Sequence, residues 1–140
     1  MLPLRLVRDT NVVVSAVLKP EGLQRTVLLI AVSKPARLYA SQAILAEYRE
    51  VLRRPELRIR KGLQSRLMAL IENRAHLVQP VHALRAAKDP DDDMFLECAD
   101  VARADYLITG NTRHFPGFWK ATKIISSREF VTLAAPHFIP

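Results

Sequence analysis

The sequence is poor in cysteine, glycine and aromatic residues: it has one cysteine, four glycines and 6% aromatics in 140 residues. The single Cys98 excludes an internal disulfide and agrees with a reducing compartment, so we expect a cytoplasmic protein. No apolar run approaches the ~20 residues that span a bilayer. The start MLPLRLVRD becomes charged too early for a signal peptide. We therefore expect neither a membrane protein nor a secreted disulfide-bonded domain.

Acidic residues are in the minority, with 14 Asp and Glu against 21 Lys and Arg, so the formal net charge is +7. Such an excess favours a polyanionic partner, for example nucleic acid, an anionic membrane surface or an acidic protein. The apolar share of 49% is that of a globular protein and excludes a disordered or collagen-like chain. No repeat or flexible linker divides the sequence, so we expect a single domain over residues 1–140.

Short apolar segments alternate with longer amphipathic segments along the chain. We expect strands at residues 4–7, 37–40, 77–78, 106–109 and 123–125. We expect helices at residues 12–18, 23–32, 42–52, 63–77, 94–102 and 128–134, the first capped by Thr10 or Asn11 and the third by Ser41. A longer strand is the alternative for residues 12–18, because valines are poor helix formers. The alternation predicts an α/β three-layer sandwich, with a mainly parallel central sheet flanked by helices.

Acidic and amide side chains follow several of the expected strands. Asp9, the aspartates at 91–93 and Asn111 fall at strand ends or helix starts, and Glu47 borders the apolar stripe of its helix. Each residue alone is typical of a helix cap or a solvated surface. Ligands of open α/β sheets bind beyond the carboxyl ends of the strands, and oxygen ligands suit Mg²⁺ or Mn²⁺. The combination therefore indicates a cation site able to act on a phosphodiester.

Four segments together resemble the PIN-domain ribonucleases, specifically the toxins of prokaryotic toxin–antitoxin pairs. They are DTNVVVSA at 9–16, SQAILAEY at 41–48, DPDDDMFLECA at 89–99 and ADYLITGNTRHFP at 104–116, in the order and at the spacing of that family. The resemblance implies a PIN-like fold and a metal-dependent endoribonuclease that hydrolyses single-stranded RNA. It also implies the toxin of a type II pair, with an antitoxin protein as partner and a homodimer or higher homo-oligomer as assembly.

The resemblance also implies roles for four residues, Asp9, Glu47, Asp92 and Asn111. Asp9 and Asp92 would hold Mg²⁺ or Mn²⁺, Glu47 would complete the metal shell or orient the attacking water, and Asn111 would position that water. Asp93 is the alternative to Asp92. We prefer Asp92 because the apolar residues three, four and seven positions later then match the buried face of the family's helix.

Two residues depart from the family pattern. Asn111 stands where many PIN domains have aspartate, which leaves a three-carboxylate site for which we expect one firmly held ion. Arg8 stands where the family more often has an apolar residue, and its charge would lower the local negative potential. Both departures favour the alternative hypothesis, a catalytically weak or inactive PIN-like RNA-binding module. A flap-type DNA nuclease ranks below both, because its representatives are longer.

Basic residues are densest between residues 49 and 66. We expect Arg53, Arg54 and Arg113 to contact the substrate through RNA phosphates, because the sparse aromatics do not favour base stacking. His114 is expected to anchor its loop, with phosphate contact or acid catalysis as the alternative.

Overall fold

The computed structural model describes residues 4–19, 22–81, 87 and 89–138 of the chain, and side chains as far as residue 134. Its strands are β1 (Arg5–Arg8), β2 (Arg37–Ala40), β3 (His76–Leu77), β4 (Tyr106–Ile108), β5 (Phe118–Trp119) and β6 (Thr122–Ile125). Its helices are α1 (Thr10–Leu18), α2 (Leu23–Ala31), α3 (Gln42–Leu52), α4 (Lys61–Arg74), α5 (Asp93–Ala102) and α6 (Ser127–Phe138). Short 3₁₀ turns cover Pro55–Leu57, Pro90–Asp92 and Thr112–His114. No helix among the described residues is long and apolar enough to cross a membrane.

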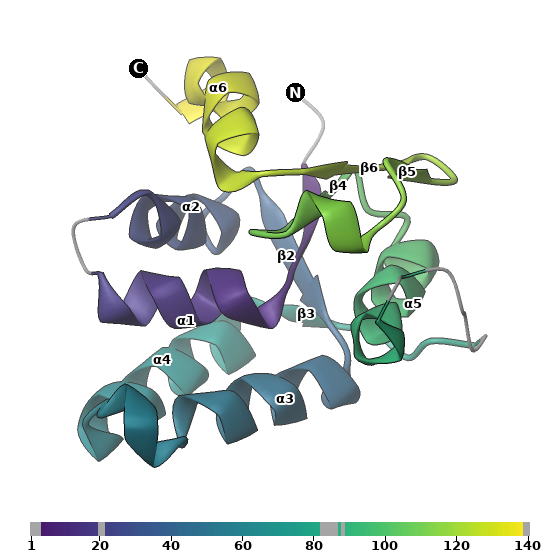
Figure 1. Ribbon diagram of the computed structural model, residues 1–140. Helices are drawn as coiled ribbons and strands as arrows, with labels where there is room; N and C mark the ends of the chain where they lie inside the picture. The colour runs from purple at the N-terminus through teal and green to yellow at the C-terminus, as the bar shows by residue number, and fades with distance from the viewer. Residues whose placement is uncertain (1–3, 20–21, 82–86, 88, 139–140) are drawn as a thin grey trace.

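Within the described residues the strands form one six-stranded sheet in the order β3-β2-β1-β4-β6-β5. All neighbouring strands are parallel except β5, which runs antiparallel to β6. The helix α5 packs on β1, β2 and β4 (Figure 1), whereas α1 and α2 pack against each other and α6 packs on α2. The predicted α/β sandwich with a mainly parallel sheet is therefore confirmed.

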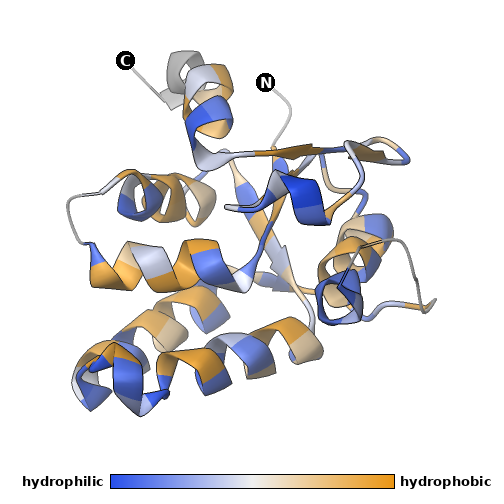
Figure 2. Ribbon diagram, in the orientation of Figure 1, coloured by the Kyte–Doolittle hydropathy of each residue, from blue (hydrophilic) through white to orange (hydrophobic). Residues whose placement is uncertain are grey.

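The apolar core follows from this layering, because β1 lies between two strands and under helices on both faces. Leu6 and Val7 of β1 are fully buried, as are Leu107 and Ile108 of β4. In Figure 2 the middle of the sheet and much of α1 and α2 are hydrophobic, whereas the 3₁₀ turn after β4 is hydrophilic. The carboxyl ends of the parallel strands thus leave the core at an edge that carries polar residues.

The first helix differs in two ways from what its sequence predicts. The alternative of a longer strand at residues 12–18 is wrong, because α1 is helical from Thr10 to Leu18. Its cap is Asp9, whose side chain accepts the Val12 N–H, and not Thr10 or Asn11. Burial explains the helix: Val12, like the other valines of α1, is packed in the core, and this packing outweighs the weak helix propensity of valine.

Two further boundaries were predicted imperfectly. The helix expected to reach Leu77 ends at Arg74, because His76 and Leu77 pair with β2 as the edge strand β3. The short antiparallel strand β5 was not predicted at all, since Phe118 and Trp119 form only two residues of strand. The prediction for α3 is confirmed, with Ser41 accepting the Ile44 N–H as the cap.

Candidate active site

Asp9 lies where β1 passes into α1, and three hydrogen bonds fix it there. Its backbone N–H donates to the Ile108 carbonyl at 3.1 Å, which joins the ends of β1 and β4. One carboxylate oxygen accepts the Val12 N–H at 3.1 Å, and the other accepts the hydroxyl of Thr109. The side chain is only 5% exposed. The chain thus presents one immobilised carboxylate at the centre of the sheet's carboxyl edge.

The pKa of Asp9 is raised above its usual value by burial, which penalises the charged carboxylate. The hydrogen bonds from Thr109 and Val12 act in the opposite direction, as does the positive charge of Arg8. These donors favour the ionised form, so the local structure partly offsets the cost of burying the charge.

Glu47 of α3 is brought to the same edge by Thr10, whose hydroxyl donates to the Glu47 carboxylate. The next residue, Tyr48, is fully buried and donates its hydroxyl to the Arg8 carbonyl. Two bonds therefore tie α3 to the junction of β1 and α1. A glutamate that looks solvated by its helix position alone is held beside Asp9.

Asp92 precedes α5 and completes the set of three predicted carboxylates. Its pKa is raised to about 6 by burial and by the negative charges of Asp89, Asp9 and Glu47, while His114 acts in the opposite direction. The Nδ1 atom of His114 lies 3.6 Å from the Asp92 carboxylate. The negative charges of Asp9 and Glu47 therefore reach Asp92. His114, expected to anchor a loop, lies at this edge.

The neighbouring Asp93 has a different environment. It is buried as the first residue of α5, and its carboxylate accepts the Ala87 N–H at 2.8 Å. The charges of Asp9 and Glu47 act on the pKa of Asp92. The placement favours Asp92 as the third carboxylate, which remains a prediction.

Thr109 is a site residue that sequence reasoning missed. It is fully buried at the end of β4, donates its hydroxyl to Asp9 and accepts the Asn111 N–H at 3.0 Å on the same oxygen. Asn111 itself is exposed beside this bond. The sequence did contain a signal for Thr109, because it is a polar residue that directly follows an apolar strand. A hydroxyl buried at such a position requires a hydrogen-bond partner, which predicts a contact with a nearby polar side chain.

The model of the PIN domain family matches residues 5–113 of the chain. The chain belongs to the PIN domain family. It is also similar to an uncharacterized protein of Methanocaldococcus jannaschii, 26% identical over 113 residues, which cover 79% of this chain and 72% of the relative. The predicted family is thus confirmed, and PIN domains are generally nucleases.

This PIN domain also resembles the crystal structure of VapBC2 from Rickettsia felis bound to a DNA fragment from their promoter. The TM-score is 0.62 at 15% identity, over 88% of this chain and 98% of the matched chain. At this identity the likeness supports the fold alone.

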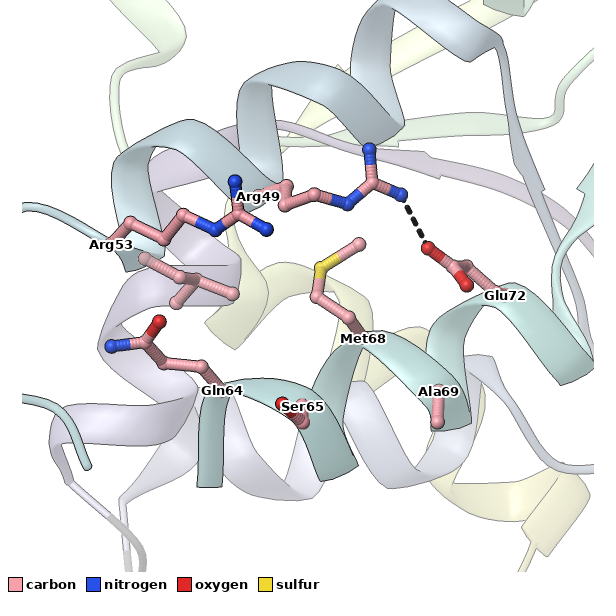
Figure 3. A pocket seen from close by; sticks show the side chains of 8 residues that line it. Arg49, Arg53, Gln64, Ser65, Met68, Ala69 and Glu72 are labelled. Carbon is pink, nitrogen blue, oxygen red and sulfur yellow. Dashed lines mark hydrogen bonds and ion pairs between the residues drawn. The ribbon is translucent and has the colours of Figure 1, made fainter. Parts of the chain in front are cut away.

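The predicted RNA-contacting arginines fall in two separate places in the PIN domain. Arg113 is exposed in the turn that carries His114, at the carboxylate edge. Arg53 and Arg54 are exposed just past the end of α3, six and seven residues beyond Glu47, which is roughly 9 to 10 Å along a helix. Arg53 lines a pocket of about 270 Å³ between α3 and α4, in which Arg49 pairs with Glu72 (Figure 3). Among the described residues, neither Arg53 nor Arg54 forms an ion pair with Asp9, Glu47 or Asp92, and their contact with RNA remains a prediction.

The carboxylates are suited in chemistry to a divalent cation. Among the described residues, no group of three or more His, Cys, Asp or Glu side chains converges closely enough to enclose a metal ion. The donors are nevertheless hard oxygens, and the pKa of Asp92 is raised by burial and then by repulsion from Asp89, Asp9 and Glu47, which a cation at this edge would offset. Asp9, Glu47 and Asp92 therefore fit such a group by charge and donor type.

Proposed function

We propose that this PIN domain is a metal-dependent endoribonuclease that hydrolyses single-stranded RNA. The proposal rests on one observation above all. Asp9, Glu47 and Asp92 lie at the carboxyl edge of a parallel sheet, where burial, and after it the negative charges of Asp89, Asp9 and Glu47, raise the pKa of Asp92 to about 6. The net charge of +7 attracts a polyanion to the chain. The carboxylates at one edge of the sheet would hold a cation that acts on a phosphodiester of that polyanion.

In this proposal Asp9 and Asp92 hold Mg²⁺ or Mn²⁺, and Glu47 completes the shell or orients the attacking water. When bound, such a cation supplies charge neutralisation for the phosphodiester and lowers the pKa of water. Asn111 positions the water through its amide, and Thr10 and Thr109 keep the two carboxylates Glu47 and Asp9 in place.

The substrate binds through its phosphates in this proposal. Arg113 is exposed at the carboxylate edge and is placed to contact the phosphates nearest the cut. Arg53 and Arg54 extend the contact toward the far end of α3. Such contacts attract RNA without selecting its sequence.

We further propose that the protein is the cytoplasmic toxin of a type II toxin–antitoxin pair, with an antitoxin protein and a second copy of the chain as partners. The matched structure is a VapBC2 complex bound to promoter DNA, and the proposal extends its pairing to this chain through the shared fold. Leu23 and Leu29 of α2 are 36% and 51% exposed, so α2 offers apolar side chains to a second copy of the chain. Co-purification of the chain with the product of a neighbouring gene would test the pairing.

Cleavage of a labelled single-stranded RNA in Mg²⁺ or Mn²⁺ tests the nuclease. We expect activity in the wild type and its loss in Asp9→Asn and Asp92→Asn, while circular dichroism shows that both variants fold. Asp91→Asn is the matched control, because Asp91 is an exposed aspartate next to Asp92 and should leave activity unchanged. Equal cleavage by the wild type and the two site variants would contradict the proposal.

The second candidate function is an RNA-binding module without turnover. It is favoured by Asn111, which supplies no negative charge, and by the absence of an enclosed metal-ligand cluster among the described residues. RNA binding that persists in EDTA, with no cleavage under Mg²⁺ or Mn²⁺, would support it over the nuclease.

A further inference from the structure

Tyr48 is a fully buried residue of α3 whose hydroxyl reaches the neighbouring strand. It donates that hydroxyl to the backbone carbonyl of Arg8, the last residue of β1, 40 residues earlier in the chain. The other buried residues of α3 are apolar, namely Ile44, Leu45 and Leu52. A phenylalanine would fill the same space without a hydroxyl that needs a partner. Packing alone therefore does not account for the hydroxyl of Tyr48.

The carbonyl that accepts this bond belongs to a well-fixed part of the molecule. Strand β1 lies between β2 and β4 in the sheet, and Arg8 pairs there with Ile108 of β4. The side chain of Arg8 is fully buried, and the next residue, Asp9, donates its N–H to the Ile108 carbonyl. The hydroxyl of Tyr48 is therefore anchored one residue away from Asp9, on backbone that the sheet holds in place.

Glu47 precedes Tyr48 in α3, and two bonds of different kinds determine where its carboxylate lies. The bond from Tyr48 to the Arg8 carbonyl holds the helix against β1, whereas the bond from the Thr10 hydroxyl holds the Glu47 side chain itself. A hydrogen bond weakens steeply when its distance and angle change, so Thr10 meets Glu47 only if α3 is correctly placed. The two bonds end on residues 8 and 10, so they flank Asp9.

We infer that Tyr48 is a positioning residue, whose bond to the Arg8 carbonyl sets the place of Glu47 relative to Asp9. Tyr48 acts through Glu47 and does not itself touch the substrate. A displacement of about 1 Å in a catalytic group can reduce a rate about 100-fold, so one buried hydroxyl can matter for cleavage. The inference rests on the proposed function where it gives Glu47 a part in cleavage, but the placement of Glu47 can be measured without RNA.

The first experiment follows the side-chain carboxyl carbon of Glu47 by NMR of ¹³C-labelled protein without RNA. Thr10→Val removes the hydroxyl that donates to Glu47, so it gives the signal of a released carboxylate. Tyr48→Phe deletes one oxygen and keeps the ring, and its Glu47 signal should move toward that of Thr10→Val. Tyr106→Phe is the matched control, because that ring packs on Phe130 at the start of β4. It should leave the signal at the wild-type position.

The second experiment measures RNA cleavage in two backgrounds. Tyr48→Phe should lower kcat roughly tenfold and leave KM unchanged, because the substrate does not contact Tyr48. In the Glu47→Gln background the same change should bring no further loss of kcat, since the residue through which Tyr48 acts is gone. The free energy of unfolding should fall equally in both backgrounds, which separates a role in cleavage from support of the fold.

An unchanged Glu47 signal in Tyr48→Phe overturns the inference, and so does an equal loss of kcat in both backgrounds. Where Glu47→Gln leaves no measurable cleavage, the NMR signal decides. If Tyr48→Phe does not fold by circular dichroism, para-aminophenylalanine at position 48 replaces it. This residue keeps the ring and a weaker donor, so it should move the Glu47 signal partway.

The proposed function fails separately from this inference. If the wild type cleaves RNA and the Glu47 signal in Tyr48→Phe is unchanged, only the role of Tyr48 is rejected. If no form cleaves RNA and the signal moves as expected, only the nuclease is rejected, and Tyr48 still holds Glu47 in place.

Discussion

The two ends of α1 carry opposite charge in very different settings. At its first turn Asp9 is buried and held by hydrogen bonds to both oxygens, with Glu47 held beside it by Thr10. At its last turn lies a groove of about 540 Å³, lined by Val17, Leu18, Arg58, Ile59, Arg60, Gly62, Leu63 and Arg66. The arginines of this groove are exposed. Negative charge is therefore concentrated and fixed in this molecule, whereas positive charge is spread over the surface.

This difference teaches where each kind of charge is useful. A buried carboxylate needs hydrogen bonds to remain ionised, and the same bonds fix its direction for catalysis or cation binding. Exposed arginines need no such support, and they attract a polyanion over about 8–10 Å at ordinary salt. The net charge of +7 is a property of the surface, and the site has the opposite sign.

Removing the hydrogen bond from Thr109 to Asp9 should have the largest effect on RNA cleavage and on stability among the changes considered. Thr109→Val keeps the shape of the side chain but deletes the hydroxyl that donates to Asp9 and accepts the Asn111 N–H. We expect a loss of RNA cleavage of roughly 10- to 100-fold, as for other residues that orient metal ligands. Stability should fall by about 1–3 kcal/mol, because a buried carboxylate loses a donor. Single-turnover cleavage and urea unfolding measure the two effects.

Thr109→Ser is the matched control, since it keeps the hydroxyl and loses only a methyl group. It should retain most of the activity. If the valine and serine variants cleave RNA equally well, the hydrogen bond from Thr109 is not needed to position Asp9 for cleavage.

The fold was predictable because each element carries its own signal. The helix α3 has a serine cap and a regular apolar stripe, and the apolar strands β1 and β4 are too short for helices. The failures arose where tertiary contacts decide. Residues 76–77 join β2 as a strand because an edge is available, and β5 has only two residues. Both β3 and β5 are two residues long, too short for an alternating sequence pattern that would predict a strand.

The candidate site was predictable to the extent that strand ends converge. Asp9 and Asp92 follow from their positions beside β1 and before α5. Three features did not follow: the bond from Thr109 to Asp9, the approach of His114 to Asp92, and the distance of Arg53 from the carboxylates. Each depends on how loops and helices are oriented in three dimensions, which residue spacing does not encode.

Neutralising Arg53 and Arg54, past the end of α3, should have a smaller effect than disturbing the carboxylate edge. We expect the double variant R53Q/R54Q to raise KM for RNA several-fold and to leave kcat unchanged, because these arginines lie beyond Glu47 at the end of α3. The slope of log affinity against log salt should fall by about 0.7 for each lost phosphate contact. Fluorescence anisotropy over a range of salt concentrations measures the slope.

The control for this pair is Arg128→Gln, an exposed arginine on α6, which packs on α2 rather than on α3 or α4. It should change neither KM nor the salt slope. A fall in kcat in R53Q/R54Q would show that Arg53 and Arg54 take part in the chemical step. It would contradict a role limited to RNA binding.

The smallest effect expected is a pH dependence of stability at Asp92. Its pKa is about 6 in the folded chain and near 3.8 in its usual state, so the folded chain binds more protons between these values. The free energy of unfolding should therefore fall as the pH rises from about 4 to about 6, and remain lowered above that range. The shift of about two pKa units sets an upper bound of roughly 3 kcal/mol. The side chain is 23% exposed, so solvent screening reduces the expected change to roughly 1 kcal/mol.

Asp92→Asn isolates this contribution, because the amide cannot ionise and occupies nearly the same volume. In the absence of divalent cations, the stability of the variant relative to the wild type should increase from pH 4 to pH 7 in urea unfolding. Mn²⁺ at pH 7 should then reverse the order, since it stabilises only the chain that can bind it. A difference that stays constant with pH would mean that neither burial nor the acidic neighbours raise the pKa of Asp92 in the folded chain.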